Sequence, residues 1–139
     1  MSKENVEIVL RGYQAFVAGD LAAVAELLDP EIEWRGVGGE FVPADLDEVR
    51  RVLASRLADG YRIELERCIG RENEVLVAFR ASGVEKDASD DRPLQTRRYF
   101  TVGRYYGIVT VRNGRVVAVQ DYPHWNAALE ALGLEDEDL

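Results

Sequence analysis

The N-terminal third of the chain has the hydrophobic spacing of amphipathic helices. Between Ser2 and Gly19 the apolar side chains recur every three or four residues and fall on one helical stripe, made of Val6, Val9, Leu10, Tyr13, Phe16 and Val17. Ser2 is a capping residue type and Gly19 a terminating one, which predicts a helix between them. Asp20 then caps a short second helix, which Asp29 and Pro30 close.

A third helix is predicted after a short strand. Residues 31–35 resemble a brief strand, and residues 36–43 form a loose connection. Asp45, with Glu48 three positions later, resembles a capping box. The apolar stripe that follows predicts a helix ending at Gly60, and it consists of Leu46, Val49, Val52, Leu53 and Leu57.

Beyond Gly60 the pattern changes from the helical period to strand alternation. Strands are predicted at 61–69 and 75–84, followed by a polar loop at 85–95 and a long hairpin at 99–122. Helices first and consecutive antiparallel strands afterwards predict a single α+β domain over all 139 residues. The helices are expected on one face of a curved antiparallel or mixed sheet.

The hairpin has a turn that predicts its register. Asn113 and Gly114 favour a two-residue type I′ turn, because that turn needs positive φ at both central residues. With this loop Tyr106 lies opposite Asp121, and Arg104 lies on the diagonal within reach of a long side chain. One face of the hairpin then carries Phe100, Val102, Arg104, Tyr106, Ile108, Val117, Val119 and Asp121.

Asp121 is the most informative residue, because it is a carboxylate on an otherwise apolar face. A carboxylate there must be paired, hydrogen-bonded or protonated, since an isolated buried charge is too costly. One interpretation is a structural trio in which Arg104 and the Tyr106 hydroxyl satisfy Asp121. The other is a ligand pocket that contains a titratable group. The residues themselves leave both interpretations open.

The opposite face of the hairpin is nearly as apolar, although an exposed sheet face should be polar. It carries Tyr99, Thr101, Tyr105, Val109, Val111, Val116, Ala118 and Tyr122. Something is therefore expected to cover this face. We predict a second copy of the chain, which makes a homodimer through the sheet. An overlying loop of the same chain is the alternative.

The last part of the chain is predicted to be a short helix and a tail. The helix spans about 125–132 after Pro123 and ends at Gly133. The acidic residues 135–139 are expected to fray, as chain ends do.

Composition narrows the classes of partner. The formal charge of -9, from 26 acidic and 17 basic residues, opposes the phosphate attraction on which nucleic-acid binding depends. The chain shows no leader peptide and no apolar run of membrane-spanning length, and Cys68 is the single cysteine, so a cytoplasmic protein without membrane attachment is expected. With His124 as the one histidine and no phosphate-binding glycine loop, we expect neither metal nor cofactor.

Two segments resemble a known family. Residues 9–34, VLRGYQAFVAGDLAAVAELLDPEIEW, and residues 109–134, VTVRNGRVVAVQDYPHWNAALEALGL, resemble the SnoaL-like branch of the nuclear transport factor 2-like superfamily. That superfamily includes ketosteroid isomerases, limonene epoxide hydrolases and polyketide cyclases. The resemblance implies a cone-shaped, cystatin-like α+β fold, commonly dimeric, with a deep pocket between the helices and the concave side of the sheet.

The resemblance also implies candidate site residues. Asp121 matches the position of a catalytic aspartate in the hydrolases and cyclases, while Arg80 resembles the arginine of the hydrolase Arg-x-Asp element, in which Ser82 replaces the acid. Tyr13 lies one residue from the oxyanion-binding tyrosine of the isomerases. The isomerase base falls near Trp34 and the second oxyanion donor near Gly107, so neither known dyad is complete.

The sequence thus predicts a largely apolar pocket with Asp121 as proton acceptor and with Tyr106 and Arg104 orienting it or stabilising negative charge. The remaining pocket residues are predicted to be Tyr13, Trp34, Arg80, Ile108 and Val119. The predicted activity is isomerisation, cyclisation or hydration of a small apolar organic molecule. The alternative is a non-catalytic protein of the same fold that binds a small ligand or serves as a structural homodimer.

Overall fold

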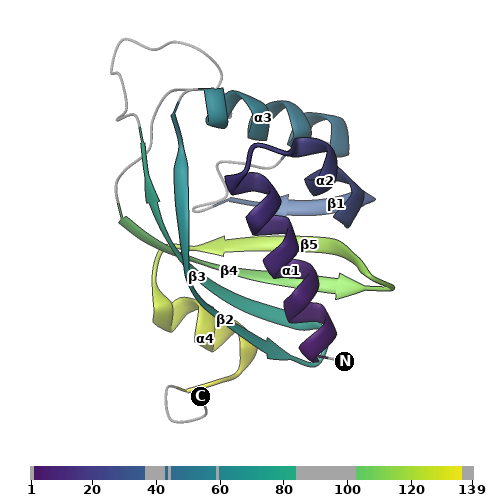
Figure 1. Cartoon of the computed structure of the whole chain (residues 1–139). Coiled ribbons are helices and arrows are strands. Elements are labelled where there is room, and N and C mark those ends of the chain that lie inside the picture. The colour runs from purple at the N-terminus through teal and green to yellow at the C-terminus, as the bar shows by residue number, and fades with distance from the viewer. Residues whose placement is uncertain (1, 37–42, 44, 59, 84–102, 136–139) are drawn as a thin grey trace.

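The computed structural model describes residues 2–36, 43, 45–58, 60–83 and 103–135 (Figure 1). The predicted loop at 85–95, the start of the predicted hairpin at 99–102 and the tail at 136–139 lie outside the described residues. The elements are α1 (Ser2–Val17), α2 (Leu21–Leu27), β1 (Leu28–Arg35), α3 (Leu46–Ala58), β2 (Arg62–Arg71), β3 (Glu74–Ser82), β4 (Gly103–Arg112), β5 (Arg115–Tyr122) and α4 (Trp125–Leu132).

The described strands form one curved, open, mixed sheet in the order β1-β5-β4-β3-β2. β1 pairs with β5 in parallel, and the other neighbours are antiparallel. Figure 1 shows α1 crossing one face of this sheet, α2 and α3 beside β1, and α4 against the opposite face. The predicted α+β class with the N-terminal helices packed on a curved sheet is confirmed, but the helices were expected on one face and α4 lies on the other.

Local sequence signals account for the helix boundaries. The Asp20 carboxylate accepts a hydrogen bond from the Ala23 amide at 3.1 Å, and that of Asp45 accepts one from the Glu48 amide at 2.9 Å. Gly19 has φ +78, as expected for a residue that ends a helix in the left-handed region. β1 begins at Leu28, earlier than expected, and accommodates Pro30 because it is an edge strand.

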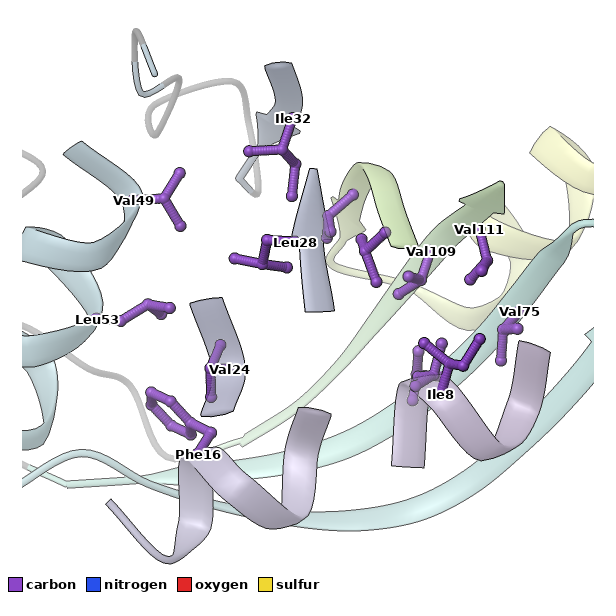
Figure 2. Packing of buried hydrophobic residues seen from close by; sticks show 14 residues of the cluster. Ile8, Phe16, Val24, Leu28, Ile32, Val49, Leu53, Val75, Val109 and Val111 are labelled. Carbon is purple, nitrogen blue, oxygen red and sulfur yellow. The ribbon is translucent and has the colours of Figure 1, made fainter. Parts of the chain in front are cut away.

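Apolar residues gather in two clusters, one on each side of the sheet. The larger lies between the sheet and the first three helices, where Figure 2 shows Phe16, Val24 and Leu53 converging from α1, α2 and α3. The smaller lies under α4 and includes Leu76 and Leu129. Helices of the same chain therefore cover apolar residues on both faces of the sheet.

The predicted hairpin register holds only near the turn. Asn113 and Gly114 have φ 53 and φ 78, as a type I′ turn requires, and the predicted pairs of Arg112 with Arg115 and of Val111 with Val116 are present. Beyond them the register shifts, so that Thr110 pairs with Ala118, and Val117 is left as an extra residue on β5.

This shift corrects the prediction that Tyr106 faces Asp121. The partner of Asp121 is Gly107, and Tyr106 instead pairs with Tyr122. A one-residue slip moves every later side chain to the other face of a strand. Asp121 therefore shares a face with Tyr105 and Val109 rather than with Arg104, Tyr106 and Ile108.

The packing of the N-terminal helices removes the reason for expecting a homodimer. Tyr105, Val109, Val111 and Val116 were predicted on a face needing a partner, but three of them belong to the cluster beneath the N-terminal helices, and Tyr105 lines the cavity described below. Tyr122 packs under α4 instead, while Tyr99 and Thr101 lie outside the described residues. The homodimer itself stays a prediction.

Candidate functional site

A cavity of about 410 Å³ lies between the inner face of the sheet and α1, α2 and α3. This volume is within the range of about 300–1,000 Å³ found for small-molecule pockets. Most of its lining is apolar: Ile8, Val9, Phe16, Val24, Leu27, Leu28, Leu53, Ile63, Phe79, Ala81, Val109, Val116 and Val119. The polar lining is a short set, namely Tyr13, Trp34, Arg56, Tyr61, Tyr105 and Asp121.

Asp121 reaches this cavity from an inner strand of the sheet. It stands on β5, whose neighbours are β1 on one side and β4 on the other. From β1, the indole nitrogen Nε1 of Trp34 donates a hydrogen bond to Asp121 Oδ2 at 3.1 Å. From β4, Gly107 is the residue directly opposite, and a Cβ added there would lie 3.0 Å from Asp121 Oδ1. The carboxylate thus lies between the indole of Trp34 and the backbone of Gly107, which has no side chain.

The protonation of Asp121 is unusual. Burial raises the pKa of its carboxyl group from 3.8 to about 6, while the Trp34 hydrogen bond and the positive charge of Arg56 lower the pKa and limit the rise. The group therefore titrates close to neutral pH. A carboxyl group with such a pKa can hold or release a proton under physiological conditions.

Three tyrosines place phenol groups around the same space. Burial raises the pKa of Tyr13 well above its ordinary value, and the negative charge of Asp121 raises it further. The pKa of Tyr61 is raised by the same two causes in the same order. Tyr105 completes an aromatic wall with Phe79, whose ring centroid lies 6.1 Å from that of Tyr105 and 6.1 Å from that of Tyr13. Tyr13 and Tyr61 therefore remain protonated at neutral pH and can donate hydrogen bonds.

Arg56 is the one positive charge among the described lining residues. It lies on α3 and was not among the predicted site residues. A signal was present, because Arg56 follows Val49, Val52 and Leu53 by seven, four and three positions and so continues their apolar stripe. An arginine on a core-facing stripe is typical of a residue that reaches an internal polar group. With Asp121 ionised, the formal charges of the described lining sum to zero.

The structure brings only part of the predicted site together. Asp121, Tyr13, Trp34 and Val119 all line the cavity. Among the predicted residues, Trp34 has the most direct contact with Asp121, through the hydrogen bond from its indole.

The other predicted residues lie on the far face of the sheet, which corrects those placements. Arg104 forms an ion pair with Glu66 at 2.9 Å on the exposed surface. Tyr106 packs its ring against Trp125 with the centroids 5.5 Å apart, and Ile108 is buried under α4. Because the hairpin slip turns Asp121 to the opposite face, these three residues do not share a face with it.

Arg80 is also outside the cavity. Its side chain is half exposed and lies 3.8 Å from the carboxylate of Glu64 on the neighbouring strand. Strand alternation explains this position, because Phe79 and Ala81 on either side of Arg80 point into the cavity.

Tyr61, Phe79 and Tyr105 line the cavity without having been predicted as site residues. Tyr105 was assigned to the opposite face by the unshifted register. Among the described residues no group of three or more His, Cys, Asp or Glu side chains is arranged to hold a metal ion. Within the same residues, none of the helices has the length and apolar character needed to cross a bilayer.

Comparison with known proteins agrees with this architecture. The family model described as a SnoaL-like domain matches residues 9–119. A putative SnoaL-like polyketide cyclase from Jannaschia sp. CCS1 superposes with a TM-score of 0.68 at 15% identity, covering 97% of this chain and 95% of that one. No curated protein matches the sequence.

Two further structures carry different names on the same fold. A putative ketosteroid isomerase from Kribbella flavida DSM 17836 has a TM-score of 0.68 at 10% identity, covering 87% of this chain and 78% of that chain. An epoxide hydrolase from M. tuberculosis, described as LEH-like, has a TM-score of 0.67 at 15% identity, covering 87% and 83%. At these identities the likeness concerns the fold, which hosts several activities.

Proposed function

This chain belongs to the family of SnoaL-like domains, and from that membership and the cavity we propose that it acts on a small, largely apolar organic molecule. In this proposal Asp121 is a general base for isomerisation, cyclisation or hydration. The observation that carries it is the one carboxyl group among the described lining residues, which has a pKa of about 6 on the wall of a largely apolar cavity.

The placement of Asp121 suits a base because the ideal catalytic pKa lies near the working pH. Burial makes the ionised carboxylate a stronger proton acceptor than an exposed one, while the Trp34 indole restrains its orientation. The two residues that flank Asp121, Trp34 on β1 and Gly107 on β4, belong to strands of the sheet and not to loops. A rigidly held base loses little energy to reorientation when it accepts a proton.

Negative charge that develops on the substrate also needs stabilisation. The phenol groups of Tyr13 and Tyr61 and the guanidinium of Arg56 surround the same cavity. Phenol donors in a water-poor site can stabilise an oxyanion such as an enolate. The names of the structural neighbours, a cyclase, an isomerase and a hydrolase, support reaction classes in which a base and a polarising donor act together.

A second candidate function is binding without chemistry. It is favoured by the lack of a second carboxyl group among the described residues that line the cavity. Reactions that need an acid as well as a base would have to use a phenol, whose pKa is raised here for Tyr13 and Tyr61. A homodimer, which light scattering would detect, is compatible with either function.

The test is proton exchange in D₂O with a panel of neutral cyclic ketones, enones and lactones, followed by proton NMR. Epoxides are added to the panel and followed by diol formation. We expect at least one compound to exchange or react with the wild type, and to bind Asp121→Asn without reacting. Binding without exchange throughout the panel would support the second candidate. Absence of binding by every compound would contradict both functions.

Tyr13→Phe is the matched variant for the oxyanion role. It removes one phenol hydroxyl and keeps the ring that packs on Phe79. We expect it to lower the exchange rate by about 10²-fold or more while leaving binding almost unchanged, since one oxyanion donor contributes on that order. An unchanged rate would assign stabilisation to Tyr61 or Arg56 instead.

A further inference from the structure

The two carboxylate oxygens of Asp121 have different surroundings. Oδ2 accepts the 3.1 Å hydrogen bond from Trp34 Nε1 on β1. Oδ1 lies toward β4, where the facing residue is Gly107. Among the described residues no group donates a hydrogen bond to Oδ1. Oδ1 is therefore the oxygen that is left for a ligand.

We propose that Gly107 is a positioning residue for Asp121, because its bare backbone lets Oδ1 lie against β4 while Oδ2 keeps its hydrogen bond to Trp34. This inference rests on the proposed function, since it concerns the carboxylate assigned there as base. Gly107 lies in a regular strand and does not have a positive φ, so its backbone conformation does not demand glycine. Glycine is needed instead because the Asp121 carboxylate occupies the space next to position 107.

One distance decides whether a side chain fits at position 107. An added Cβ at Gly107 would lie 3.0 Å from Asp121 Oδ1, whereas ordinary contacts begin at 3.4 Å, and its next neighbour is the Gln120 carbonyl oxygen at 3.8 Å. The methyl group of alanine would thus contact the carboxylate and almost nothing else. To relieve this contact the carboxylate must give way by a few tenths of an ångström, and we expect this movement to weaken the bond between Oδ2 and Trp34.

The chain supplies a matched control on the same strand. Gly103 is four positions before Gly107, so its Cβ would point to the same face, yet no atom of the described residues lies within 4 Å of that position. Gly103→Ala and Gly107→Ala therefore make the same chemical change in the same strand. They differ in whether the new methyl group meets Asp121.

The first measurement is the NMR resonance of the Trp34 indole N–H as a function of pH. In the wild type this resonance should titrate with Asp121, and Trp125, on the other face of the sheet, serves as internal control. We expect Gly107→Ala to remove most of this dependence and to raise the proton affinity of Asp121 about tenfold, the lower end of what one hydrogen bond to a charged group contributes. Gly103→Ala should match the wild type.

A double-mutant cycle tests whether Gly107 acts through the hydrogen bond. If it does, Trp34→Phe alone and Trp34→Phe with Gly107→Ala should give Asp121 nearly the same proton affinity. Two additive shifts would mean that Gly107 acts on Asp121 by another route, and this would overturn the inference.

Thermal unfolding keeps the inference testable if Gly107→Ala folds poorly. Asp121→Ala removes Oδ1, so adding Gly107→Ala to it should cause no further loss of stability. A Gly107→Ala defect that persists in the Asp121→Ala background would overturn the inference, because the methyl group would then clash with something else.

The exchange assay separates this inference from the proposed function. If Gly107→Ala shifts Asp121 as expected but no compound reacts with the wild type, the proposed function fails and the positioning role stands. If the wild type reacts and Gly107→Ala retains both its rate and its Trp34 titration, the positioning role fails alone. With both correct, the acidic limb of the kcat profile should move upward by about one pH unit in Gly107→Ala, and KM should change little.

Discussion

The buried carboxyl group of Asp121 should make the stability of the protein depend on pH in a defined direction. Its pKa rises from 3.8 to about 6 on folding, mainly through burial. Between these two values the folded protein holds the proton and the unfolded chain has released it. Stability from this group is therefore greatest below pH 3.8 and is lost as the pH rises to about 6.

The size of the effect follows from the same values. A rise from 3.8 to about 6 corresponds to about 3 kcal/mol, at about 1.36 kcal/mol per pKa unit. Asp121→Asn keeps the shape of the side chain and cannot ionise. The difference in unfolding free energy between Asp121→Asn and the wild type should therefore grow by about 2–3 kcal/mol between about pH 4 and about pH 7.

Urea unfolding followed by circular dichroism at a series of pH values measures this difference. A chain of 139 residues is short enough for two-state analysis. Other titrating groups contribute to both proteins and largely cancel in the difference. A difference that is the same at every pH would refute the reasoning, because Asp121 would then have an ordinary pKa and be solvated.

Three further outcomes are expected. Trp34→Phe should raise the pKa of Asp121 by about one unit and move the acidic limb of the exchange-rate profile upward by the same amount, since a hydrogen bond that stabilises the ionised form is lost. Leu76→Ala, which leaves a hole under α4, should cost about 2–5 kcal/mol in urea unfolding, whereas Val17→Ala at an exposed position should change stability by less than about 0.5 kcal/mol. Arg104→Ala should leave ligand binding and exchange unchanged, because its ion pair lies on the outer face, and a loss of exchange would show that this face contributes to the site.

The signals for helix and turn boundaries lie close together in sequence, and most of them were predictable. The capping carboxylate of Asp20 is three residues from the amide that it accepts from, and the turn at Asn113 and Gly114 needs only its own two residues. Such interactions form within a single turn of the chain, so a linear pattern contains them. The final helix, Trp125–Leu132, was predicted for the same reason.

Residues of the site were harder to predict because they depend on register and on distant segments. A single extra residue at Val117 decides that Asp121 faces Gly107 rather than Tyr106. Nothing in the alternation around Val117 predicts that irregularity. The predicted roles of Tyr106 and Arg104 depended on the unshifted pairing.

The sequence by itself determined that a carboxyl group, Asp121, stands on an apolar strand, and local chemistry placed the helices and the turn. Tertiary structure alone decided what surrounds it, because the Trp34 donor is 87 residues away and arrives through the parallel pairing of β1 with β5. Arg56 arrives from a third segment, α3. Burial, hydrogen bonding and charge at one atom depend on distances through space, so they are set only when the sheet and the helices have packed together.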